Sequence, residues 1–172
     1  FVGASIDTRR WPIEYVKVLI DKCFDNKDIQ FYLLSGPLEP EETKKVCEEI
    51  SHKVPYYYKF DISQLSCFIS KLDLLVTNDS GPLHIAKAVN TPSIGIFGPT
   101  HPEIAVIENG SFSLSGYNNC DILKRTHTDR TPCFKKNCPS KNCIKSVTVE
   151  QVYKTILEYF SLKKNNLYEK RN

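Results

Sequence analysis

Apolar positions in residues 1–98 follow two alternating spacings. Residues 12–25 carry apolar side chains three and four positions apart, the period of an amphipathic helix, and Pro12 suits a first helical position. Residues 29–35 form an apolar run of strand length. The pattern continues with expected helices over residues 39–50, 62–72 and 82–89 and expected strands over residues 54–60, 74–78 and 93–98. This alternation predicts parallel βαβ units.

The C-terminal part of the chain shows a different pattern. Periodicity fades between residues 101 and 145, so we expect a loop-rich segment there. Thr148 opens a final helix, because Gln151 follows at the spacing of a capping box. Residues 163–172 are polar and charged. We therefore expect one domain over residues 1–162 followed by a frayed polar tail.

Composition narrows the class of protein. The chain has 172 residues, of which 41% are hydrophobic, enough for one globular core and too many for a disordered chain. The net charge of +3 is too small and too dispersed to predict a nucleic-acid partner. No apolar run approaches the ~20 residues that a membrane span requires. Because the chain lacks Met and a leader, we interpret it as a fragment.

Candidate chemistry lies in the loops that follow the expected strands, because open parallel sheets bind ligands outside their carboxyl ends. In the loop over residues 78–84, the N–H groups of Ser80 and Gly81 open a helix and would face an anion. Gly81 permits a phosphate to approach closely, and His84 projects from the first turn. The alternative is an ordinary helix cap formed by Asp79 or Ser80, with His84 on the helix face.

The first loop, residues 4–10, ends with two arginines. A guanidinium of Arg9 or Arg10 could clamp a phosphate with two hydrogen bonds. The alternative is a solvated arginine pair beside a packed Trp11. The chain has neither a Walker A motif nor a G-x-G-x-x-G fingerprint, which counts against nucleoside triphosphatases and dehydrogenases. It also lacks the G-x-S-x-G elbow of serine hydrolases.

The seven cysteines point to a reducing compartment, because an odd number does not suit a fully paired secreted framework. Four of them cluster: Cys120, Cys133, Cys138 and Cys143. Their spacing is at the loose end of known zinc-ligand spacings, with His127 as a spare ligand. A structural zinc, unliganded thiols and one or two disulfides all remain open.

Several segments together resemble a known family. The Asp-Ser-Gly-x-x-His element at residues 79–84 and the Phe-Gly-Pro-Thr element at residues 97–100 are fairly specific for it. Residues 3–12, 33–36 and the Cys-rich stretch before the last helix match in order and spacing. Residues 2–160 resemble the C-terminal half of glycosyltransferase family 9, the ADP-heptose:lipopolysaccharide heptosyltransferases.

The resemblance implies a fold and a reaction. The fold would be α/β, a Rossmann-like parallel sheet with helices on both faces, forming the C-terminal half of a GT-B fold whose N-terminal acceptor domain is absent here. The enzyme would transfer heptose with inversion from ADP-heptose to a lipopolysaccharide core, requiring no cofactor for catalysis. The family's catalytic acidic residue belongs to the absent half, so we expect this chain alone to be inactive. The resemblance also implies a bacterial cytoplasmic enzyme at the inner membrane, with peripheral association of the full enzyme.

Donor-binding positions transfer from the family to eight residues. Glu39 would lie near the ribose and Phe60 near the base, while the others would surround the diphosphate and sugar. The full set is Ser5, Arg9, Glu39, Phe60, Asp79, Ser80, Gly81 and His84.

Two departures concern the donor. Arg9 stands where the family usually has Lys, and His101 replaces a common Asp. One alternative is therefore a GT-B transferase that uses another nucleotide sugar. Further alternatives are a non-enzymatic Rossmann-like module with a metal site in the cysteine cluster, and an epimerase or sugar-nucleotide hydrolase.

Overall fold

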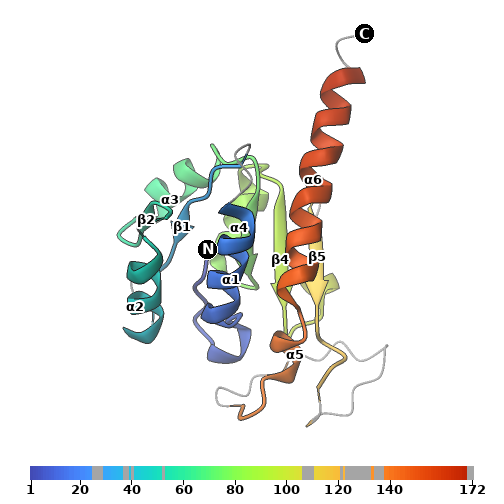
Figure 1. Cartoon of the computed structure of the whole chain (residues 1–172). Helices are drawn as coiled ribbons and strands as arrows, with labels where there is room; N and C mark the ends of the chain where they lie inside the picture. Colours follow the sequence, from blue (N-terminus) through green and yellow to red (C-terminus); the bar gives the residue numbers. More distant parts are fainter. Residues whose placement is uncertain are drawn as a thin grey trace.

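Strands and helices alternate along the chain (Figure 1). The computed structural model describes residues 1–24, 29–36, 39, 41–51, 53–105, 111–120, 122, 133 and 138–169. The helices are α1 (Ile13–Phe24), α2 (Glu41–Ile50), α3 (Ile62–Ile69), α4 (Gly81–Ala88), α5 (Asn142–Lys145) and α6 (Val149–Glu169). The strands are β1 (Leu33–Leu34), β2 (Tyr56–Tyr57), β3 (Leu75–Asn78), β4 (Ser93–Phe97) and β5 (Phe112–Ser115). Two short 3-10 turns are η1 (Asp7–Arg9) and η2 (Pro102–Ala105).

The N-terminal segment joins two parallel ladders. One ladder pairs β1 with β2, and the other has the order β3-β4-β5. Between them, the backbone nitrogen of Val2 donates to Leu34 O at 2.9 Å and that of Phe1 donates to Val76 O at 2.7 Å. The strands therefore lie in the order β2, β1, N-terminal segment, β3, β4, β5. When the six strands are numbered along the chain, with the N-terminal segment as the first, this order is 3-2-1-4-5-6, that of the Rossmann fold. The Rossmann-like class predicted from the sequence is confirmed.

Helices cover both faces of the sheet. Successive side chains of β3 point to opposite faces: Leu75 packs with Ile69 of α3 and Ala86 of α4, whereas Val76 packs against the cluster on the other face. That other face is covered by α1 and α6, which contact each other; α6 also contacts β4, and side chains of all three elements share one buried cluster. Figure 1 shows α6 continuing well beyond the sheet.

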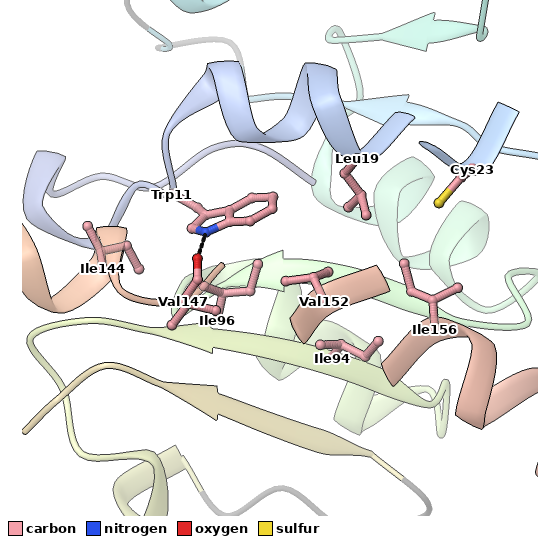
Figure 2. Close-up of a cluster of buried hydrophobic side chains, with 9 residues drawn as sticks. All are labelled: Trp11, Leu19, Cys23, Ile94, Ile96, Ile144, Val147, Val152 and Ile156. Carbon is pink, nitrogen blue, oxygen red and sulfur yellow. Dashed lines mark hydrogen bonds between the residues drawn. The ribbon is translucent and has the colours of Figure 1, made fainter. Parts of the chain in front are cut away.

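Trp11 is central to the larger core. Figure 2 shows it between α1, β4 and the start of α6, where its Nε1 donates to Val147 O at 2.8 Å. Only 3% of Trp11 is exposed. The cluster comprises Trp11, Leu19, Cys23, Ile94, Ile96, Ile144, Val147, Val152 and Ile156. Packing of this kind fixes the end of the first loop against the sheet, which matters for the site described below.

Most expected elements exist, although several boundaries differ. The strands expected over residues 29–35 and 54–60 are only two residues long as β1 and β2, because ladder pairing continues no further. Strand β5 lies in the segment expected to be loop-rich. The expected capping box is present, since Thr148 Oγ1 accepts from Gln151 N at 3.2 Å. Helix α6 continues past Leu162 to Glu169, so the polar segment expected to fray is helical there.

In the described part of the chain, every helix is too short or too polar to cross a bilayer.

Candidate functional site

The strand order reverses between the N-terminal segment and β3. In open α/β sheets this switch point leaves a crevice at the carboxyl ends of the strands, where ligands bind. Two loops leave the sheet there: residues 4–10 with turn η1, and residues 79–81 at the start of α4. The switch point therefore brings together two of the loops that the sequence singled out.

Arg9 and Asp79 meet across this crevice. Arg9 Nη1 lies 3.3 Å from Asp79 Oδ2, and the exposed fractions of the two side chains are 22% and 7%. The two groups are close enough for an ion pair, but their geometry is not that of a hydrogen bond. Arg9 Nε and Asp79 Oδ2 are both buried and lack a hydrogen-bond partner among the described residues. Both side chains thus keep hydrogen-bonding capacity inside the crevice.

The amino end of α4 lies directly beside this pair. Ser80 is the N-cap residue, but its hydroxyl donates to Asn78 O at 3.3 Å and caps no helix N–H. Asp79 N donates to Ile96 O and Leu83 N to Ser80 O. Between them, the amides of Ser80 and Gly81 have no acceptor within the described residues. These amides and the positive helix end suit an anion.

Gly81 and His84 border the same helix end on its solvent side. A Cβ added to Gly81 would meet no atom within 4 Å, so the space beside its Cα is open. His84 is exposed, one turn into α4. The side-chain cap that was the alternative for Ser80 is absent, and the open face over Gly81 leaves room for a ligand.

The two arginines of the first loop occupy different environments. Arg10 Nε donates to Glu39 Oε2 at 3.2 Å, its Nη1 lies 3.3 Å from Asp7 Oδ1, and its Nη2 donates to Ala4 O. These bonds tie Arg10 to its own loop and to Glu39. Of the two candidates for a phosphate clamp, Arg9 is the one beside α4.

Glu39 is buried against glycine backbone. Its Oε1 would lie 2.1 Å from a Cβ at Gly3 and 3.2 Å from one at Gly36, so a side chain at Gly3 would displace the carboxylate. Burial raises the pKa of Glu39, and the charge and hydrogen bond of Arg10 offset part of that rise. The carboxylate is therefore engaged by the protein itself at the edge of the crevice.

Asn78 was missed as a separate site residue by the sequence analysis, which treated it as part of the motif. Its Oδ1 accepts from Trp11 N at 3.0 Å, and its Nδ2 donates to Val2 O at 2.9 Å and Gly3 O at 3.2 Å. The signal that could have identified Asn78 is a polar amide at the end of an apolar strand, because a buried amide is costly unless it is hydrogen-bonded.

Ser5 and Phe60 are the two remaining donor-binding residues expected from the sequence. Ser5 is exposed at the start of the first loop. Phe60 follows β2 and stacks on Tyr57, with ring centroids 5.6 Å apart, and contacts Phe68 at 5.3 Å. Phe60 also lines a surface pocket with residues 56–59 and Gln64. This pocket offers flat aromatic surfaces near the carboxyl end of β2.

The clustered cysteines are described only in part. Cys143 is buried, whereas Cys120, Cys133 and Cys138 are half-buried, and none forms a disulfide. Among the residues that the structure describes, no three Cys, His, Asp or Glu side chains gather as a metal site would require. His127 and much of the intervening chain lie outside the described residues. Zinc binding here stays a prediction.

A cavity of about 440 Å³ lies between the two ladders. Its lining is mainly apolar and includes Phe31, Leu74 and Phe160, while Arg9, Asp79 and the start of α4 are not part of it. The polar groups suited to an anion therefore lie outside this cavity, at the carboxyl edge of the sheet.

Comparisons with known proteins identify the family of this chain. Residues 1–144 match glycosyltransferase family 9 (heptosyltransferase). Lipooligosaccharide heptosyltransferase 2 of Campylobacter jejuni serotype O:2 is 30% identical over 87% of this chain and 46% of its own length. Lipopolysaccharide heptosyltransferase 1 of Campylobacter coli is 29% identical over 92% of this chain and 45% of its own.

Solved structures share the fold. A family 9 glycosyl transferase from Veillonella parvula superposes with a TM-score of 0.72 at 22% identity, covering 92% of this chain and 44% of that one. Escherichia coli heptosyltransferase WaaC with ADP-2-deoxy-2-fluoro heptose has a TM-score of 0.64 at 18% identity, covering 92% and 41%. The chain spans about half the length of the curated relatives it matches, and it belongs to glycosyltransferase family 9, the heptosyltransferase family.

Proposed function

We propose that this chain is the donor-binding half of a heptosyltransferase. In this proposal it binds ADP-heptose, and the whole enzyme transfers the heptose with inversion to a lipopolysaccharide-core acceptor held by a second half. Support comes from the names of the Campylobacter relatives and from the E. coli structures with ADP and an ADP-heptose analogue. The relatives are bacterial, and we extend the proposal to an enzyme that works at the cytoplasmic face of the inner membrane.

The observation that carries the proposal is the Arg9–Asp79 pair beside α4. A buried polar atom without a partner costs free energy, and this crevice holds two of them, one on each side chain. A diphosphate would accept hydrogen bonds from Arg9 and from the amides of Ser80 and Gly81. Asp79 Oδ2 would accept a hydrogen bond from a sugar hydroxyl.

These donors suit the departure of a nucleoside diphosphate. Negative charge grows on the leaving diphosphate as the glycosidic bond breaks. A guanidinium and amides at a helix N-terminus stabilise that charge most strongly when they are already in place. The protein thus supplies the positive groups from its own loops.

Calorimetric titration tests the proposal. We expect the chain to bind ADP and to bind UDP at least about tenfold more weakly. The His84→Ala variant should bind ADP more weakly, because His84 borders the helix end. Lys87→Ala is the matched control, since Lys87 is exposed on the same helix one turn farther on, and it should retain wild-type affinity. Tight UDP binding with no heat from ADP would contradict the proposed donor.

A further inference from the structure

We propose that Asn78 is a positioning residue that closes the loop carrying Arg9 and so sets Arg9 against Asp79. The inference rests on the proposed function, since it concerns the geometry of the donor-binding crevice. No motif assigned Asn78 this part, and its three hydrogen bonds carry the argument.

One side chain binds both ends of the first loop. Its Nδ2 donates to the carbonyls of Val2 and Gly3, where the chain enters the loop. Its Oδ1 accepts from the backbone N–H of Trp11, where the chain leaves it. Arg9 lies between these two points, in turn η1. The loop is therefore held at both ends by a residue that directly precedes Asp79.

The arrangement solves a hydrogen-bonding problem of the switch point. The N-terminal segment and β3 diverge there, so backbone groups that would otherwise pair with a neighbouring strand need another hydrogen-bond partner. Asn78, which is 3% exposed, supplies donors and an acceptor in one planar group. Its amide orientation follows from its partners, because Trp11 N can only donate and the two carbonyls can only accept.

An aspartate or a leucine at this position would fail in different ways. Leu matches Asn in approximate size but leaves all three backbone groups unpaired. Asp keeps an acceptor for Trp11 N, yet its ionised carboxylate would face the carbonyls of Val2 and Gly3. A protonated carboxyl would again donate to one of them. The N78D variant should therefore recover function on acidification, which a purely steric defect would not.

The experiment compares N78L, N78D and the control T91V by ADP titration. Thr91 Oγ1 donates to Ile69 O at 2.9 Å in a buried bond at the amino end of β4, so T91V loses one buried hydrogen bond away from the crevice. We expect N78L to lose about tenfold or more in ADP affinity and T91V to change it by less than about twofold. The deficit of N78D relative to wild type at the same pH should shrink as the pH falls.

Fluorescence gives a second measurement, because Trp11 is the only tryptophan of the chain. N78L should shift the Trp11 emission to longer wavelength, while T91V should not. Wild-type affinity and emission in N78L, an equal loss in T91V, or a pH-independent deficit in N78D would overturn the inference. A wild-type chain that binds no ADP would contradict the proposed function instead, and the emission of N78L would still test whether Asn78 closes the loop.

Discussion

The guanidinium of Arg9 lies 3.3 Å from the carboxylate of Asp79, across the crevice where the order of the strands reverses. Each partner comes from a different half of the sheet. The contact neutralises two charges that are mostly removed from water, yet it leaves a buried donor and a buried acceptor unused. A ligand with both a phosphate and a hydroxyl would satisfy the two atoms together.

Replacing Arg9 tests the phosphate side of this pair. Arg9→Ala should weaken ADP binding by about 2 kcal/mol, since a hydrogen bond to a charged group contributes roughly that much. Arg9→Lys should lose less, because it keeps the charge but not the planar geometry. Lys17→Ala serves as the control in the same titration, since Lys17 is a cation on α1 whose side chain is 43% exposed. An Arg9→Ala variant with wild-type affinity would contradict the assignment.

Two glycine substitutions separate binding from folding. Gly81→Ala should raise the free energy of unfolding by about 0.4–1 kcal/mol, because the added Cβ meets nothing and the unfolded chain loses freedom. It should also weaken ADP binding, since that Cβ enters the space over the helix end. Gly116→Ala should destabilise the fold, because its Cβ would lie 1.7 Å from Cys143 O. Thermal unfolding and titration measure both effects, and tighter ADP binding by Gly81→Ala would count against the site.

Glu39 predicts a pH dependence. Burial raises its pKa in the folded chain above its ordinary value. Its contribution to stability is therefore full below the unfolded pKa and is lost as the pH rises through the raised folded pKa. The wild-type chain should therefore lose stability relative to Glu39→Gln as the pH rises above about 4, the ordinary pKa of a glutamate. Urea unfolding of both proteins at a series of pH values measures this difference in stability. A gain in stability of the wild type relative to Glu39→Gln as the pH rises would show that the charge of Arg10 outweighs burial.

The capping box of α6 predicts a local stability effect. Thr148→Ala should lower the free energy of unfolding by about 1 kcal/mol, because Gln151 N loses the oxygen that satisfies it. Lys154→Ala on the exposed face of the same helix should change stability by less than about 0.5 kcal/mol. Chemical denaturation followed by circular dichroism compares them. Equal effects of the two variants would mean that the cap contributes nothing measurable.

Features that depend on neighbouring residues were predictable from the sequence. The capping box of Thr148 and Gln151 and the apolar spacing of α1 are local, because a helix makes its hydrogen bonds within a few residues. Helix α4 and its start at Asp79-Ser80-Gly81 are local in the same sense. The extents of β1 and β2 and the existence of β5 were not predictable in this way, since strands pair with partners far along the chain.

The sequence by itself determined the alternation of strands and helices, the helix end at Ser80 and Gly81, and the resemblance to family 9. Only the tertiary structure decided which arginine faces Asp79, that Arg10 is bound by Glu39, and that Asn78 ties both ends of the first loop. The physical reason is that adjacent arginines are equivalent in a sequence. They become different when the fold places Arg9 beside the start of α4, against Asp79, and holds Arg10 against Glu39.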